Sequence, residues 1–260
     1  MPPLITLTTD LGEQEPFAAS IKGALLSLCP GVNLVDLSHQ VSPHDVTEAA
    51  LFVLGAVPHF PAGTVHLINV APGPQPVIAK AGDQVLVCPD NGILTLLEEH
   101  FPIDEALALP VPESVSCGNA QTFFGREVLA PAAAAIASGK SLAEVAEVGG
   151  ETVELQRLDW PKPQQAGSRK IEGRIMHIDR FGNLITNIHR NLLESAAIER
   201  IAVNNISIRS LSCSYSDVEP GHPIAVFGHS GYLEVAYNGE KASERLGIET
   251  GILISVFLEK

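Results

Sequence analysis

The sequence has few basic residues. Lysine and arginine together number 16, against 30 aspartate and glutamate residues, so the formal net charge is −14. An acidic surface of this kind repels nucleic acids and anionic lipids and attracts cationic ligands. We therefore expect neither a nucleic acid nor a membrane as a partner.

Cysteine, metal-binding patterns and long apolar runs are scarce as well. Cys29, Cys88, Cys117 and Cys213 lie far apart with no CxxC spacing, which predicts buried free thiols. The nine histidines form no HxxxH or HExxH pair, so we expect no metal site. The N-terminal residues contain neither a basic segment nor a long apolar run. This pattern predicts a cytoplasmic protein without a signal peptide or membrane span.

Three common catalytic and nucleotide-binding motifs are missing too. No GxGxxG follows the first expected strand, and no GxxxxGK[ST] occurs, so the sequence lacks a dinucleotide fingerprint and a P-loop. No GxSxG occurs either, which argues against a serine hydrolase with a nucleophile elbow.

What is present is the pattern of a two-domain globular protein. Of the 260 residues, 45% are hydrophobic, enough for a substantial core. Residues 1–158 alternate strand-like and helix-like stretches, which predicts an α/β N-terminal domain with a largely parallel sheet. In the helix expected after Pro16, Phe17, Ile21, Leu25 and Leu28 fall on one face. Strands are expected at 4–9, 34–37, 64–70 and 84–88, and further helices at 45–54, 127–137 and 141–144.

Composition changes after residue 158. Two prolines, a glycine and polar residues make 159–168 a linker. Residues 169–260 then predict a smaller all-β C-terminal domain, a sandwich or a barrel, with a short helix at 241–246. Its strands are expected at 174–178, 184–188, 200–203, 206–211, 224–226, 232–236 and 252–257.

Three polar segments are candidates for a binding site. Asp10 follows the first strand, where the carboxyl ends of a parallel sheet form a ligand crevice, and its carboxylate could accept hydrogen bonds from a ribose diol. A turn or helix-cap aspartate fits the same position. Residues 178–183 (IDRFGN) combine an acid, an aromatic ring and an amide, but also fit a plain β-turn. Residues 229–232 (HSGY) offer donors to an anion, or form a hairpin turn.

Taken together and in order, ten segments carry a family resemblance. They are residues 5–12 (ITLTTDLG), 21–23 (IKG), 33–39 (NLVDLSH), 43–46 (PHDV), 60–65 (FPAGTV), 89–95 (PDNGILT), 122–127 (TFFGRE), 178–183 (IDRFGN), 186–188 (TNI) and 231–236 (GYLEVA). This ordered series resembles the S-adenosyl-L-methionine (SAM) hydroxide adenosyltransferases and their fluorinase and chlorinase relatives. The resemblance implies an α/β N-terminal and a β-rich C-terminal domain. It also implies a homotrimer that holds SAM between one subunit's N-domain and its neighbour's C-domain, with no further cofactor.

The resemblance also assigns roles to individual residues. Asp10 would hold the ribose hydroxyls, and Asp179 would receive the methionyl ammonium. Asn183 would contact a polar edge of the ligand. Phe181 and Tyr215 would offer aromatic faces to the adenine, and Ser230 falls where the family grips the methionine carboxylate. These pairings make chemical sense, because carboxylates pair with ammonium groups and diols, and π-faces with purines.

The reaction centre departs from the family pattern. Hydrolysing relatives carry Asp-Pro-Gly-Val-Gly after the third strand with an arginine shortly beyond, and a later Thr-Phe-His-Gly-Arg. Their Asp, Arg and His form the triad that positions or activates water. This chain has Ala71 at the acidic position, Phe124 at the histidine position, and no arginine between Thr64 and Lys80.

The halogenase pattern is incomplete as well. Fluorinases have a tyrosine at the position of Ala71 and a serine at that of Gly125, and chlorinases pair the tyrosine with a glycine. Three functions therefore stay open. The first is SAM hydrolysis with a rebuilt centre, the second is binding of SAM or adenosine without catalysis, and the third is C5′ chemistry with another nucleophile or an elimination.

Overall fold

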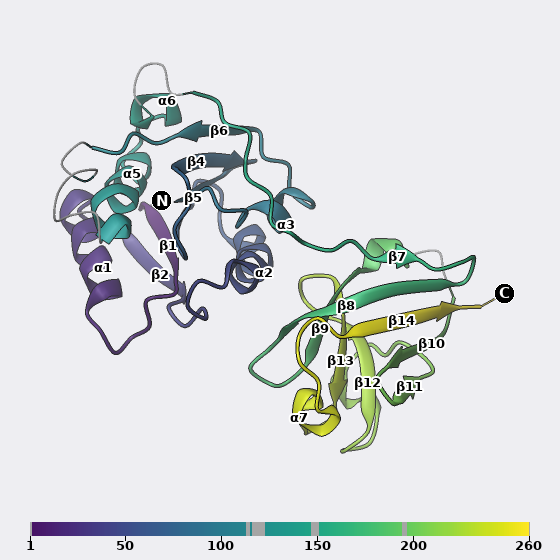
Figure 1. The fold of residues 1–260 in the computed structure, drawn as a ribbon. Coiled ribbons are helices and arrows are strands. Elements are labelled where there is room, and N and C mark those ends of the chain that lie inside the picture. Colours follow the sequence, from purple (N-terminus) through teal and green to yellow (C-terminus); the bar gives the residue numbers. More distant parts are fainter. Residues whose placement is uncertain (1, 113–114, 116–122, 147–150, 194–196, 260) are drawn as a thin grey trace. The chain divides into compact units, whose positions relative to one another are not determined.

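The computed structural model describes residues 2–112, 115, 123–146, 151–193 and 197–259, which form two compact units, Met1–Asp159 and Trp160–Lys260. The first unit is built on a six-stranded sheet with the order β2-β1-β3-β5-β4-β6. Helices α1 and α5 cover one face and α2 the other (Figure 1). The strands are β1 Leu4–Thr9, β2 Asn33–Ser38, β3 Val65–Asn69, β4 Pro76–Ala81, β5 Gln84–Pro89 and β6 Glu105–Ala108.

This sheet is mixed, which refines the expectation of a largely parallel one. Strands β2, β1, β3 and β5 are parallel neighbours, but β4 runs antiparallel to both β5 and β6. The antiparallel part arises because residues 82–83 form a tight turn between β4 and β5, too short for a crossover helix. Neither β4 nor β6 is among the strands expected from the sequence.

The helices of the first unit begin where the sequence supplies caps. Asp45 accepts a hydrogen bond from Glu48 N at the start of α2, and Ser141 and Glu144 form a reciprocal capping box at α6. A π-turn, Gly125–Leu129, leads into α5. The helices are α1 Phe17–Leu28, α2 Val46–Ala56, α3 Thr95–Glu98, α5 Ala130–Ala137 and α6 Leu142–Val145, with a 3-10 turn at Val57–His59.

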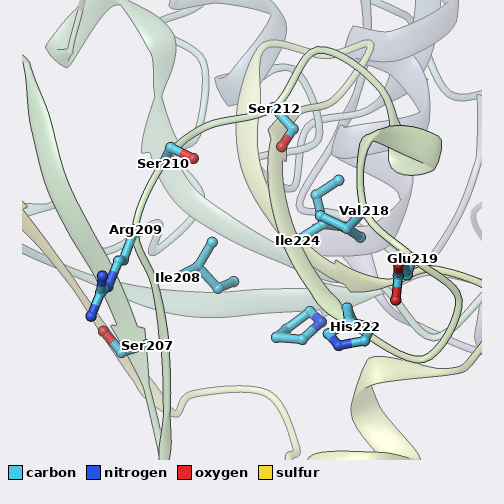
Figure 2. A pocket seen from close by; sticks show the side chains of 10 residues that line it. Ser207, Ile208, Arg209, Ser210, Ser212, Val218, Glu219, His222 and Ile224 are labelled. Carbon is cyan, nitrogen blue, oxygen red and sulfur yellow. The ribbon is translucent and has the colours of Figure 1, made fainter.

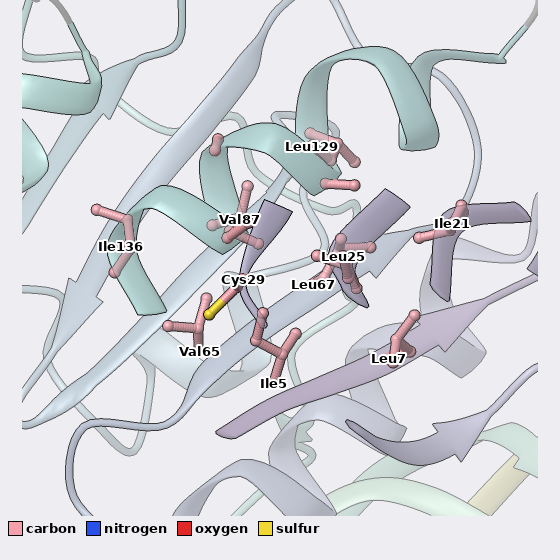
Figure 3. Close-up of a cluster of buried hydrophobic side chains, with 14 of the residues drawn as sticks. Ile5, Leu7, Ile21, Leu25, Cys29, Val65, Leu67, Val87, Leu129 and Ile136 are labelled. Carbon is pink, nitrogen blue, oxygen red and sulfur yellow. The ribbon is translucent and has the colours of Figure 1, made fainter. Parts of the chain in front are cut away.

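The main core of this unit lies between α1, α5 and the parallel strands (Figure 3). Ile21 and Leu25 of α1 are fully buried there, as the helical period predicts. The same prediction is wrong for Phe17 and Leu28, which are 45% and 52% exposed. They are the first and last residues of the helix, so each has a helical turn on one side only.

The second unit is one antiparallel sheet with the order β11-β10-β14-β8-β9-β13-β12, and β7 pairs with β8. It curls until the two edge strands approach each other, where Ser212 N donates to Ala225 O at 2.9 Å. A short helix, α7 Ala242–Leu246, and 3-10 turns at Arg190–Leu192 and Tyr215–Asp217 accompany the sheet. The strands are β7 Gln164–Gln165, β8 Lys170–Ile178, β9 Leu184–His189, β10 Ile198–Val203, β11 Ile206–Ile208, β12 Pro223–Phe227, β13 Tyr232–Tyr237 and β14 Leu253–Leu258.

All seven strands expected in this half are present, and the sheet is nearly a closed barrel. Its interior holds branched side chains from most strands, among them Ile175, Leu184, Leu233 and Ile254. In the part of the chain that the structure describes, no helix is both long and apolar enough to cross a membrane.

The cysteine prediction holds for two of the four thiols. Cys29 and Cys88 are buried and free, and burial raises the pKa of the Cys88 thiol far above its usual value. Cys213 is free but exposed, so the expectation of a buried thiol is wrong there. It lies in the loop after β11, outside the barrel interior. Cys117 lies outside the described residues.

Candidate functional site

Asp10 stands at the carboxyl ends of β1 and β3, where two loops converge on it. Its Oδ2 accepts hydrogen bonds from His44 N at 3.0 Å and Ala71 N at 3.2 Å. Both donor residues have positive φ, 63° and 52°, a conformation that costs a non-glycine residue energy and needs support from its surroundings. The Asp10 side chain is 10% exposed, and its Oδ1 has no partner among the described residues. One carboxylate oxygen thus fixes the loops, and the other is available to a ligand.

A chain of polar contacts supports the loop that carries Asp10. Thr9 Oγ1 lies 2.9 Å from His39 Nδ1, and His39 Nε2 lies 3.0 Å from Asp36 Oδ1. The backbone of His39 adds a second link, since its carbonyl accepts from Gly12 N at 2.8 Å. Burial raises the pKa of Asp36, but the hydrogen bond from Lys22 and the charge of His39 outweigh it and hold the pKa below its usual value. His39 therefore ties the ends of β1 and β2 together beside Asp10.

The resemblance aligns Ala71 and Phe124 with the acid and the histidine of the hydrolase triad, and the structure describes both residues. Asn91 Nδ2 donates to Val70 O at 2.9 Å, and a Cβ on Gly73 would lie 3.0 Å from the Asp90 backbone. The loop that carries Ala71 is therefore held on both sides. Phe124 is partly buried against the hydrophobic core of the first unit. Neither side chain can accept or donate a proton.

In the second unit, Asp179 organises its own turn. Its Oδ1 accepts from Phe181 N at 2.9 Å and from Asn183 N at 2.8 Å, and its Oδ2 accepts from Asn183 Nδ2 at 2.9 Å. Gly182 completes the turn with φ 79°. The plain-turn alternative for 178–183 is thus present in the structure. In this turn Phe181 is 73% exposed, whereas Asn183 is buried.

Tyr215 is held in place by a buried carboxylate. Its hydroxyl donates to Glu234 Oε2 at 2.6 Å, while the side chain as a whole is 42% exposed and Glu234 only 3%. Burial and the Glu234 carboxylate raise the pKa of Tyr215 above its usual value. Burial, with a contribution from the charge of Asp179, raises the pKa of Glu234. The charge of Asp179 contributes to raising the pKa of both groups.

Ser230 lies in the hairpin between β12 and β13. Gly231 N donates to Gly228 O at 3.0 Å, and Gly228 N to Tyr232 O at 2.9 Å, so the hairpin alternative for 229–232 is present as well. A Cβ on Gly228 would overlap the Glu234 carboxylate, so the hairpin packs directly on that buried group. No contact joins Ser230 itself to Asp179 among the described residues.

A groove of about 440 Å³, lined by both polar and apolar side chains, opens near the edges of β11 and β12 (Figure 2). Arg209 and Glu219 lie at opposite ends of it, and Ile224 lies between them. None of the residues singled out from the sequence lines this groove. Among the described residues, no group of three His, Cys, Asp or Glu side chains could hold a metal ion.

Comparison with known proteins decides the family. The model of the SAM hydroxide adenosyltransferase N-terminal domain matches residues 5–146, and that of the C-terminal domain matches residues 173–255. The chain belongs to this family. Its members with a named activity include an (R)-S-adenosyl-L-methionine hydrolase of Thermus thermophilus, 35% identical over 94% of this chain and 95% of the relative. A fluorinase of an Actinoplanes species is 29% identical over 98% and 97%.

The fold agrees with this assignment. The crystal structure of an uncharacterised conserved protein from Thermotoga maritima superposes with a TM-score of 0.85 at 28% identity, covering 97% of this chain and 99% of the other. At the level of the family, the comparisons support SAM binding and substitution at C5′.

The sequence alone did not indicate a role for three side chains near these sites: His39, Asn69 and Glu234. His39 and Glu234 both lie inside segments that carry the family resemblance, but a resemblance by itself gives neither a role. Asn69 lies in no such segment, and only the fold brings it next to residues of β1 and the π-turn.

Proposed function

We propose that this protein binds SAM and catalyses attack of water on its C5′ atom, releasing adenosine and methionine. The observation that carries the proposal is the geometry of Asp10. Two strained backbone segments donate to one carboxylate oxygen and leave the other without a partner, at the edge of the sheet where α/β proteins bind ligands. A ribose diol supplies the two hydroxyl donors that such an oxygen pairs with.

The second unit would bind the rest of the ligand. Phe181 and Tyr215 supply exposed aromatic faces for the adenine, and Glu234 fixes the Tyr215 ring. Asp179 would pair with the methionyl ammonium, and Asn183, whose Nδ2 already donates to Asp179, keeps its Oδ1 for the ligand. Ser230 would donate to the methionine carboxylate. The net charge of −14 favours a ligand that carries a sulfonium.

The reaction requires the protein mainly to orient water and SAM toward each other. The water oxygen bonds to C5′ as the C5′–S bond breaks, and the electron pair of that bond leaves with the sulfur of methionine. The proton lost by the water passes to solvent. Because a sulfonium is a good leaving group, a pocket that orients and partly desolvates the reactants supplies much of the rate enhancement without a general base.

The presence of Ala71 and Phe124 favours a second candidate, a protein that binds SAM or adenosine without turning it over. Neither side chain can orient water or accept its proton, so the enzymatic function requires another polar group. Attack by a different nucleophile, or an elimination, is the third candidate and predicts other products.

Binding and products separate these functions. We expect isothermal titration to give saturable binding of both SAM and adenosine. Incubation with SAM, followed by chromatography that resolves adenosine, 5′-halo-adenosine and methylthioadenosine, should yield adenosine. Binding without any product would establish the binding protein instead. Absence of heat and of a thermal shift at saturating ligand would rule out the pocket itself.

We further propose a homotrimer with composite sites, on the strength of the family resemblance alone, and a cytoplasmic location. Light scattering on the purified protein should give three times the 27.5 kDa chain mass. A clean monomer would remove the composite-site argument.

A further inference from the structure

Asn69 carries an amide without a partner among the described residues, at the carboxyl end of β3 and next to the strand that leads into Asp10. It is the last residue of β3, in register with Thr9 of β1, the residue that precedes Asp10. Its side chain is partly buried and makes no hydrogen bond with any described residue. A partly buried amide without partners costs free energy unless water or a ligand satisfies it. The position therefore suits a group that binds something absent from the free protein.

The amide fills the space over Gly125. A Cβ built on Gly125 would lie 2.8 Å from Asn69 Cγ and 2.9 Å from its Oδ1, closer than non-bonded atoms approach in folded proteins. Gly125 opens the π-turn and directly follows Phe124, and single π-turns are frequent at functional sites. It is also the position at which fluorinases carry a serine. In this chain Asn69, at the end of β3, supplies the polar group next to Gly125.

Asn69 is thus close in the chain or in space to two of the three altered positions of the reaction centre, Ala71 and Phe124. Ala71 follows it by two residues, and Phe124 is adjacent to the glycine that it contacts. An amide can accept a hydrogen bond from water through its oxygen and donate through its nitrogen, but it cannot take up a proton. It can therefore orient a nucleophilic water where a carboxylate and a histidine are missing.

We propose that Asn69 binds and orients the water that attacks C5′, so that it is a catalytic residue of this chain. The inference rests on the proposed hydrolysis of SAM. As the C5′–O bond forms and the C5′–S bond breaks, the amide oxygen keeps its hydrogen bond to the water, whose proton goes to solvent. Orientation without proton transfer implies slow turnover.

The test compares Asn69→Leu, which keeps the volume and removes the amide, with Asn33→Leu at the amino end of β2 as the matched control. At saturating SAM, we expect kcat for adenosine release to fall about 10–100-fold in Asn69→Leu, in line with the cost of misplacing a reactant. The Kd for SAM should stay within a factor of two. Asn33→Leu should leave both quantities unchanged.

A rescue distinguishes catalysis from packing. Gly125→Ser alone should lower the melting temperature, because the new side chain meets Asn69. Asn69→Ala/Gly125→Ser should recover that stability and release adenosine faster than Asn69→Ala, since the hydroxyl stands near the lost amide.

Unchanged kcat in Asn69→Leu would overturn the role of Asn69 and leave the proposed hydrolysis intact. Wild-type protein that binds SAM without releasing adenosine would overturn both.

Discussion

Restoring the triad is expected to accelerate adenosine release more than any other change to this chain. In Ala71→Asp/Phe124→His/Gln75→Arg, a carboxylate and an imidazole are again able to orient water and accept its proton. General-base assistance is typically worth ~10²–10⁴-fold in rate. The arginine is placed in the loop between Pro74 and Pro76, where the sequence has none.

The backbone is suited to these substitutions. Ala71 has φ 52°, in the left-handed region that aspartate and asparagine tolerate better than alanine. The Ala71→Asp change therefore adds no backbone strain. Phe124 is only partly buried, so its replacement by histidine costs packing on the order of 1–3 kcal/mol.

The matched control is Ala71→Asn/Phe124→His/Gln75→Arg, which has the same shape but no carboxylate. We expect it to release adenosine more slowly than the aspartate variant when the product is followed by chromatography under saturating SAM, because only the imidazole remains to accept a proton from water. If the aspartate variant is no faster than this control, the positions of Ala71 and Phe124 are not the place where water is activated. A wild-type rate already equal to that of a triad-bearing relative would mean that this chain activates water by another route, with Asp10 and His44 the next residues to replace.

The sequence predicted the second unit better than the first, for a physical reason. In an antiparallel sheet that covers one core, each strand alternates in burial and ends at a turn, and both signals are local. In the first unit β6 is a four-residue strand, Glu105–Ala108, with two alanines, which carries neither signal. Strand β4 begins with a proline and contains two alanines, so its propensity is equally weak.

The residues of the candidate site also differ in whether neighbouring sequence or distant contacts reveal them. Asp10 could be predicted because it comes directly after a buried strand of a parallel sheet. The contacts that define its chemistry join it to His44 and Ala71, 34 and 61 residues away. Asn69 could not be found at all, because its significance depends on a glycine 56 residues later that the fold brings against its side chain.

Replacing Asp10 should have the largest effect on binding. In Asp10→Ala the Oδ1 that we assign to the ribose diol disappears, and hydrogen bonds to a charged group are worth about 1.5–3 kcal/mol each. Two such bonds to a diol correspond to a loss of adenosine affinity of at least about 100-fold, since 1.4 kcal/mol is a factor of ten. The protein should also lose on the order of 1–3 kcal/mol of stability, because His44 N and Ala71 N lose their acceptor.

Asp10→Asn separates the two effects. The amide oxygen can still accept from the two backbone N–H groups, so the melting temperature should stay close to that of the wild type. Its NH₂ group stands where the free oxygen was and cannot accept from a hydroxyl. We therefore expect adenosine affinity to fall nearly as far as in Asp10→Ala. Asp104→Asn is the matched control, because Asp104 accepts from Gly82 N at 2.9 Å in a turn of the same unit.

Removing a ribose hydroxyl from the ligand takes the place of the second mutation in a double-mutant cycle. Wild-type protein should bind 2′-deoxyadenosine and 3′-deoxyadenosine more weakly than adenosine, each by the value of one hydrogen bond to Asp10. In Asp10→Ala the three nucleosides should bind with similar Kd in isothermal titration, because the group that distinguishes them is gone. If Asp10→Ala still prefers adenosine by the wild-type factor, another residue holds the ribose. Asp10 would then serve only to fix the two loops whose N–H groups it accepts.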